Sequence, residues 1–310
     1  MTNYINGSLA YDRIMHFQGR FSEQILAEHL DNINVSFTMD SMQEFFGGTA
    51  GNIAYGLSVL GDAPVLAGNL GKDGDRYLEY LNVLGVDISN VGIMQNEFSP
   101  GAYITTDLDG NQITAFNAGA MKYPCQWRAR DIDPAGSRVI ISPGNVQDMA
   151  ELPPILRQRN VPFIFDPGQS LPAWQGPDLA NALHGAFLLI TNQYELNLLC
   201  NLINADLPKL HEQVENVVVT DGFKGSTLYS RGATWQIGLG IAATVVDPTG
   251  AGDAYRAGIM AALAQGLSLV EACRTGSALA ALSVGVKGTQ GYRLPKEGLN
   301  VQAVSVTLIK

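Results

Sequence analysis

A glycine-rich turn that leads into a predicted helix carries the residues best suited to chemistry. Residues 247–255 read Asp-Pro-Thr-Gly-Ala-Gly-Asp-Ala-Tyr, so Gly250, Ala251 and Gly252 come directly before Asp253. Glycines let successive backbone N–H groups point one way, and such a turn at a helix N-terminus attracts anions. A carboxylate there would repel phosphate. Its presence indicates a base that takes the proton of an attacking hydroxyl while the N–H groups stabilise the developing charge. The alternative is an Asp253 that only stabilises the first helical turn.

Two further turns offer polar groups for a small polyhydroxy ligand. Asp12 closes the run 6–12 after the first predicted strand. A carboxylate can accept two hydrogen bonds from neighbouring hydroxyls, such as those of a ribose. The turn 46–54 contains Gly48 and Asn52. Glycine permits close approach of a ligand, and the amide both donates and accepts. Taken alone, each turn also fits an ordinary loop.

Two turns nearer the C-terminus carry further polar side chains and glycines. Asn192 and Glu195 lie three residues apart at a predicted helix start and so share one face. Their oxygen atoms could face a ligand, and the alternative is a simple helix cap. Residues 220–225 place Thr220, which can donate a hydrogen bond, before Gly222 and Gly225, which permit close approach of a ligand. A hairpin turn is the alternative there.

The elements that must position these turns alternate between strands and helices. Apolar runs predict strands at 65–70, 139–142, 163–165, 187–190 and 217–220, and helical spacing predicts helices at 53–60, 74–84, 179–184, 194–203, 253–265 and 269–284. This alternation predicts an α/β fold with a mostly parallel sheet covered on both faces. Ligands bind such sheets at the carboxyl ends of the strands, where the polar turns fall, so we expect one shared site.

Two regions break the alternation. Residues 26–34 lead into a β-rich run at 35–39, and runs at 102–108 and 111–117 are joined across Asp109 and Gly110. Asp-Gly between two β-rich runs is a strong hairpin signal. We expect a small second sheet outside the main one, with an ordinary edge hairpin as the alternative.

Together, the turns at 46–54 and 247–255 resemble the two signatures of the ribokinase-like (PfkB) family of sugar and nucleoside kinases, and the resemblance covers nearly the whole chain. It implies one ribokinase-like three-layer sandwich over 1–310, with a β-sheet lid inserted at about 13–45 and 98–120. ATP and Mg²⁺ are implied as cofactors. For the chemistry, the resemblance implies that Asp253 is the base and that Gly250, Ala251 and Gly252 form the anion hole. For the two substrates, it implies sugar binding by Asp12, Gly48 and Asn52, and nucleotide binding by Asn192, Thr220, Gly222, Gly225 and Gly252. For cations, it implies that Asn192 and Glu195 bind Mg²⁺ largely through water and that a monovalent cation such as K⁺ lies near Asp247 and Thr249.

The acceptor is predicted from a closer likeness to bacterial adenosine and broader nucleoside kinases. It is carried by segments 6–37, 111–116, 253–258 and 288–290, while Pro248 and Tyr255 depart from the common sugar-kinase pattern. We expect transfer of the γ-phosphoryl of ATP to the 5′-hydroxyl of a ribonucleoside, adenosine first. The alternatives are a kinase of a free sugar such as ribose or fructose and a non-catalytic nucleoside-binding protein. Further acceptor contacts are predicted for Ser8, Ser36, Phe37, Phe116 and Met121, of which the aromatic and Met side chains could instead be lid core.

Composition excludes several other classes. The 310 residues include 19 basic and 29 acidic side chains, and a net charge of −10 argues against nucleic acid or an anionic membrane as partner. The opening residues lack a signal-peptide pattern, and no apolar run is long enough to span a bilayer. Three widely spaced cysteines indicate reduced thiols. We expect a cytoplasmic enzyme without a P-loop, either a monomer or a homodimer formed through the lid.

Overall fold

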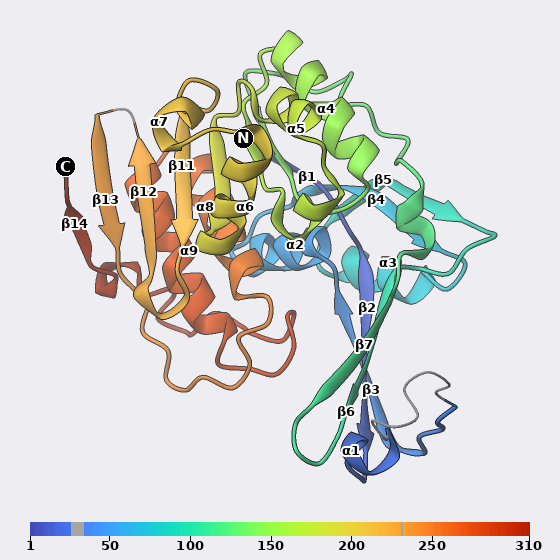
Figure 1. The fold of residues 1–310 in the computed structure, drawn as a ribbon. Coiled ribbons are helices and arrows are strands. Elements are labelled where there is room, and N and C mark those ends of the chain that lie inside the picture. Colours follow the sequence, from blue (N-terminus) through green and yellow to red (C-terminus); the bar gives the residue numbers. More distant parts are fainter. Residues whose placement is uncertain (26–33, 231) are drawn as a thin grey trace.

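The computed structural model describes residues 1–25, 34–230 and 232–310. In this part of the chain, ten strands form the main sheet in the order β14-β13-β12-β11-β10-β9-β8-β1-β4-β5 (Figure 1). Pairing is parallel from β5 to β11 and antiparallel from β11 to β14. Their bounds are β1 Thr2–Asn6, β4 Val65–Gly71, β5 Asp87–Met94, β8 Ser137–Ile141, β9 Phe163–Phe165, β10 Leu188–Asn192, β11 Asn216–Thr220, β12 Ser226–Ser230, β13 Ala233–Ile237 and β14 Val306–Leu308.

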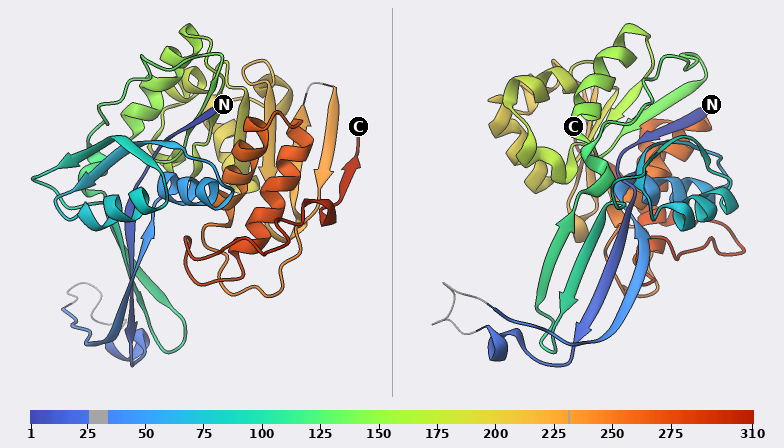
Figure 2. Two further views of the ribbon diagram at one scale, coloured as in Figure 1. Left: turned by 180° about the vertical axis from the view of Figure 1, so that it is seen from behind. Right: turned by 90° about the vertical axis from the view of Figure 1, so that its right-hand side faces the viewer.

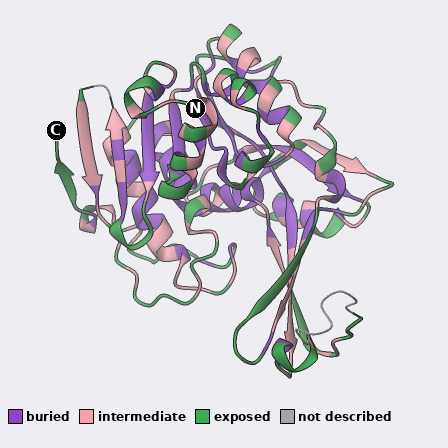
Figure 3. Ribbon diagram, viewed as in Figure 1, coloured by how far each residue is buried: buried purple, intermediate pink, exposed green. Residues whose placement is uncertain are grey.

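Helices cover both faces of this sheet, and alternate strand residues enter two separate cores. Val218 of β11 packs in one core, whereas its neighbours Val217 and Val219 pack in the other. This is the two-residue period of a strand buried on both faces. Figures 1 and 2 show the helical layers, and Figure 3 shows the buried central strands. The first core includes residues of α2 (Thr49–Val59), α3 (Asp75–Val83), α8 (Ala251–Ala264) and α9 (Leu269–Ser283); the second includes residues of α4 (Val146–Gln158), α5 (Gly176–Leu183), α6 (Gln193–Ile203) and α7 (Leu207–Leu210).

Small residues let α8 and α9 pack closely. A Cβ added at Gly258 of α8 would lie 2.6 Å from the Cα of Gly276 of α9, so the backbones approach to a distance that no side chain allows. The small residues of α8 therefore face its neighbour helix, and this close packing holds in place the helix that begins at the glycine-rich turn.

Four strands form a second sheet that projects from the main body (Figures 1 and 2). Its order is β3-β2-β6-β7, with β2 (Ala10–Phe17), β3 (Met39–Gly47), β6 (Gly101–Thr106) and β7 (Gln112–Asn117). β6 and β7 form the hairpin predicted across Gly110, which has a φ of 81°. Because β2 starts and β3 ends next to the turns at 8 and 48, the sheet joins the main body at the predicted site.

The β-rich run expected at 35–39 does not form a strand over residues 35–38, and the expectation for 26–33 lies outside the described residues. Residues 34–38 have no regular structure, and β3 starts at Met39. Phe37 instead packs its ring 4.9 Å from that of Phe17 and 5.3 Å from that of Phe21, in α1 (Phe21–Gln24). Four short 3₁₀ helices complete the described elements: η2 Gly119–Lys122, η3 Gly168–Ala173, η4 Gly222–Lys224 and η5 Val301–Ala303. None of the described helices has the length and apolar character needed to cross a bilayer.

Candidate active site

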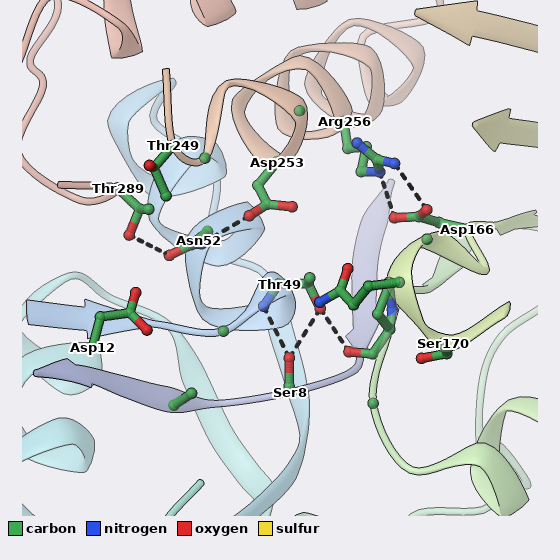
Figure 4. A pocket seen from close by; sticks show the side chains of 18 of the residues that line it. Ser8, Asp12, Thr49, Asn52, Asp166, Ser170, Thr249, Asp253, Arg256 and Thr289 are labelled. Carbon is green, nitrogen blue, oxygen red and sulfur yellow. Dashed lines mark hydrogen bonds and ion pairs between the residues drawn. The ribbon is translucent and has the colours of Figure 1, made fainter. Parts of the chain in front are cut away.

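A cavity of about 710 Å³ opens between the carboxyl edge of the main sheet, the start of α8 and the projecting sheet (Figure 4). It gathers turns that are far apart in the sequence, as the parallel arrangement predicts. Its lining includes Ser8, Ala10, Asp12, Gly48, Thr49, Asn52, Phe116, Met121, Pro143, Gly144, Asp166, Gly168, Gln169, Ser170, Asn192, Glu195, Thr220, Thr249, Gly250, Gly252, Asp253, Arg256 and Thr289.

Asp253 lies in the first turn of α8, directly after the glycine-rich turn. Gly250 has a φ of 78°, and a Cβ there would lie 2.7 Å from the Thr289 side chain, so both conformation and space require glycine. The turn therefore presents the backbone N–H groups of Gly250 and Gly252 at a helix N-terminus beside a carboxylate, whereas the Ala251 N–H donates to the carbonyl of Pro248 at 3.2 Å. Burial raises the pKa of Asp253 to about 6; Arg256 and the Asn52 hydrogen bond oppose that effect, while Asp166 and Asp12 add to it.

Asn52 fixes the carboxylate of Asp253 through a buried network. Its Nδ2 donates to Asp253 Oδ2 over 2.7 Å, as Figure 4 shows. Its Oδ1 accepts from Thr289 Oγ1 at 2.7 Å and from Gln290 Nε2 at 2.9 Å. With its oxygen saturated and its nitrogen turned toward Asp253, the amide cannot flip without losing three hydrogen bonds. The sequence suggested a sugar contact for Asn52, and the structure adds this contact with Asp253.

Arg256 and Asp166 form a buried ion pair in the cavity wall, and the sequence reading gave neither a role. Arg256 Nη2 lies 2.8 Å from Asp166 Oδ1, and Nε contacts the other carboxylate oxygen. Arg256 is 8% exposed and Asp166 1% exposed. Burial raises the pKa of Asp166 and Arg256 opposes the rise. An arginine among the small and apolar residues of α8, three positions after Asp253, is a signal that could have singled out Arg256, although it does not identify Asp166 as its partner.

The end of the cavity next to the projecting sheet contains Asp12 on β2 and Gly48, which directly follows β3. Burial raises the pKa of Asp12. A Cβ at Gly48 would lie 2.6 Å from Ser8 O and 2.7 Å from Ala10 N, so this residue has no room for a side chain. Ser8 lines the same end, but its Oγ accepts the N–H of Thr49 at 3.0 Å.

On the opposite side, Asn192 and Glu195 form a complete capping box. Asn192 Oδ1 accepts the Glu195 N–H at 2.8 Å, and Glu195 Oε2 accepts the Asn192 N–H at 2.8 Å. The alternative of a capped helix is therefore confirmed. Glu195 nevertheless lines the cavity, and its Oε1 makes no hydrogen bond within the described ranges.

Thr220 is the member of the 220–225 turn that reaches the cavity. Gly222 and Gly225 lie outside its lining, and β11 and β12 form the antiparallel hairpin that was the alternative reading of this turn. A Cβ at Gly225 would lie 2.2 Å from Ile237 O, so close packing on β13 explains that glycine.

The Asp247 carboxylate connects the loop before α8 with the loop that contains Gly288 by hydrogen bonds. Its Oδ1 accepts the Thr249 N–H at 2.9 Å, and its Oδ2 accepts the Gly288 N–H at 3.0 Å. These bonds lower its pKa although burial opposes them. Asp247 and Ala251 do not line the cavity, whereas Thr249 does.

Of the residues predicted as further acceptor contacts on the projecting sheet and beside it, some line the cavity and others do not. Phe116 and Met121 line the cavity. Ser36 is exposed and lies outside the lining, and Phe37 belongs to the aromatic cluster with Phe17 and Phe21. A strand over 35–38 would have put Ser36 and Phe37 on the projecting sheet, but these residues have no regular structure.

The fold and the cavity define a ribokinase-like phosphotransferase. Solved structures of the nucleoside kinase of Burkholderia thailandensis share this fold. The complex with inosine superposes with a TM-score of 0.83 at 37% identity, covering 97% of this chain and 96% of that chain. The complex with ADP and inosine gives 0.81 at 38% identity, covering 96% and 93%.

The sequence comparisons agree. The chain matches the pfkB family of carbohydrate kinases over residues 10–297 and belongs to that family. A nucleoside kinase of Methanocaldococcus jannaschii is 33% identical over 83% of this chain and 85% of that protein. The predicted family and fold are thereby confirmed, and the chain is a phosphotransferase that acts on an alcohol group.

Proposed function

We propose that the chain transfers the γ-phosphoryl of ATP to the 5′-hydroxyl of a purine ribonucleoside, with adenosine as the first candidate. The observation that carries the proposal is one cavity lined by Asp253, Gly250, Gly252, Asp12 and Asn52. Inosine in the B. thailandensis complex and the name of the M. jannaschii relative support a nucleoside as acceptor. The ADP in the former supports ATP as donor.

In this mechanism the ribose binds between Asp12 and Gly48, and its 5′-hydroxyl faces Asp253. The carboxylate takes the hydroxyl proton as the O5′–P bond forms and the bond from the γ-phosphorus to the bridging oxygen of ADP breaks. The backbone N–H groups of Gly250 and Gly252 stabilise the charge on the transferring group. Ala251, the third predicted member of the anion hole, donates its N–H to the carbonyl of Pro248 instead. A pKa of about 6 keeps Asp253 ionised yet basic near neutral pH.

Glu195 is the residue that fits a magnesium ion. Its Oε1 makes no hydrogen bond within the described ranges, whereas the Asn192 oxygen is occupied by the cap. In the described part of the chain, three or more His, Cys, Asp or Glu side chains do not gather as a metal cluster. Such a site suits an ion bound largely by water and substrate phosphates. When bound, Mg²⁺ neutralises phosphate charge.

The four-stranded sheet would act as a lid over the acceptor. β2 supplies Asp12 and β7 supplies Phe116 to the cavity, so movement of this sheet would open or close the site and exclude water. Every residue of β7, the outer strand, is exposed. This edge is where a homodimer through the lid would form, and light scattering of the purified protein distinguishes it from a monomer.

The substitution Asp253→Asn tests the base. It keeps size and hydrogen bonding but removes the proton acceptor, so we expect a fall in kcat of about a hundredfold to ten-thousandfold with little change in nucleoside binding. The exposed Asp131→Asn is the matched control. Turnover of Asp253→Asn near that of the control would exclude Asp253 as the base.

An acceptor panel of adenosine, inosine, cytidine, ribose and fructose, followed by ADP release, tests the substrate. We expect adenosine or inosine to give the highest kcat/KM. A higher kcat/KM for ribose or fructose would favour the sugar-kinase alternative, which the carbohydrate-kinase family supports. Absence of ADP release with every acceptor, alongside tight nucleoside binding, would favour a non-catalytic binding protein.

A further inference from the structure

Arg256 is the one basic side chain among the described residues that line the cavity. Four carboxylates, from Asp12, Asp166, Glu195 and Asp253, line the same space. A site with this balance would repel a polyphosphate, so a fixed positive charge near the anion hole is needed for a phosphoryl group to approach Asp253.

The guanidinium is held in one orientation. Arg256 Nε and Nη2 both face the carboxylate of Asp166, which is buried at the end of β9. Figure 4 shows two nitrogens turned to Asp166 and the third turned away from it. That third nitrogen, Nη1, makes no hydrogen bond within the described ranges although the side chain is 8% exposed. A fixed fork with a free N–H group suits a tetrahedral oxyanion.

The free nitrogen lies against the anion hole itself. A Cβ added at Gly252 would be 2.8 Å from Arg256 Nη1, so the guanidinium passes directly over the Gly252 backbone. Gly252 therefore serves two purposes: it contributes a backbone N–H group and leaves space for the guanidinium. Arg256 also follows Asp253 by three residues, which puts both side chains on one face of α8.

We propose that Arg256 Nη1 binds the γ-phosphoryl group during transfer, with Asp166 positioning it, an inference that rests on the proposed phosphoryl transfer at Asp253. The proton of the acceptor hydroxyl still passes to Asp253, the O5′–P bond forms and ADP leaves. Arg256 exchanges no proton and donates only to non-bridging oxygens of the transferring group. Its effect is therefore on γ-phosphate affinity and on turnover, not on nucleoside or ADP affinity.

The test uses the double variant Arg256→Met with Asp166→Asn, because Arg256→Met alone would leave a buried carboxylate unpaired. Calorimetry measures affinity for the non-hydrolysable β,γ-imido analogue of ATP, for ADP and for inosine. We expect the preference for the analogue over ADP to fall at least tenfold and kcat to fall about a hundredfold to a thousandfold. ADP and inosine affinities should stay within about twofold.

Two further variants separate binding from a structural role. Arg274→Met removes a comparable cation of α9, which pairs with Glu271 at 3.0 Å outside the cavity, and should change none of these values. Gly252→Ala keeps the N–H group but displaces Nη1, so it should lower kcat in the wild-type background and add little in the double variant. Full additivity there would contradict the inference.

The inference is overturned if the double variant keeps kcat within about threefold of wild type, or if ADP and inosine affinities fall in parallel with the analogue. The experiments also distinguish a failure of this inference from a failure of the proposed function. Asp253→Asn should retain the preference for the analogue while losing turnover, so a failure at Arg256 leaves the base assignment untouched, and a failure at Asp253 leaves the phosphate contact untouched.

Discussion

Replacing Asn52 with leucine should move the acid limb of the pH profile to higher pH. The Asn52 amide donates to Asp253 Oδ2 over 2.7 Å and lowers the pKa of that carboxyl, which burial has raised to about 6. Leucine has nearly the same shape but donates nothing. Without the bond the ionised form is less stable, so Asp253 becomes protonated, and loses its ability to accept a proton, at a higher pH than in the wild type.

The size of the change follows from the hydrogen bond. A bond to a charged group contributes about 1.5–3 kcal/mol net, and 1.36 kcal/mol corresponds to one pKa unit, so the limb should rise by about one to two pH units. The assay is kcat against pH from about 5 to about 9 with both substrates saturating, so that the limb reports the ternary complex.

The control is Thr289→Val, which removes a donor to Asn52 Oδ1 but leaves the bond to Asp253 in place. Its limb should stay at the wild-type position even if its kcat falls. Titration of ATP itself is the same in all three proteins and cannot move the limb between them. A limb of Asn52→Leu that coincides with wild type would refute the view that Asn52 tunes the base.

Three further results are expected. Gly48→Ala should lower the melting temperature more than Gly61→Ala, because both have a φ above 80° but only the Cβ at Gly48 meets backbone atoms; equal effects would assign the whole cost to backbone conformation. Glu195→Gln should raise the Mg²⁺ concentration for half-maximal rate, and an unchanged value would remove Glu195 from the metal site. If the loops joined by Asp247 hold a monovalent cation, K⁺ should raise kcat relative to N-methylglucamine, and identical rates would reject that prediction.

Local signals in the sequence predicted much of the fold. The turn at 250–252, the hairpin across Gly110 and the five core strands each depend on nearby residues, and each is present within one or two residues of its expected bounds. The projecting sheet was predicted less well. β3 begins at Met39 because Phe37 packs into an aromatic cluster with Phe17 and Phe21, a contact that the β-rich composition of 35–39 does not reveal.

The sequence indicated the turns that form the site, but it did not indicate which of their side chains contact one another. Arg256 and Asp166 are 90 residues apart, and no pattern in either segment indicates that the two side chains form a pair. The same holds for Asn52 and Asp253, which are 201 residues apart. Glycine-rich turns can be predicted from the sequence because each glycine is required by the local backbone conformation. An ion pair or a hydrogen bond between distant elements depends on the complete fold and cannot be predicted in this way.

Asp253 and the projecting sheet are joined by one chain of buried and partly buried hydrogen bonds. From Asp253 it passes through Asn52 to Gln290 Nε2, which donates to Tyr77 Oη at 2.8 Å, and Tyr77 Oη donates to the carbonyl of Gly47, the last residue of β3, at 2.7 Å. Tyr77 is fully buried, so water cannot replace these partners without unpacking the core. A shift at the end of β3 therefore has to break one of these bonds or move the Asn52 amide that orients the Asp253 carboxylate. The position of the sheet and the alignment of Asp253 are for this reason constrained together.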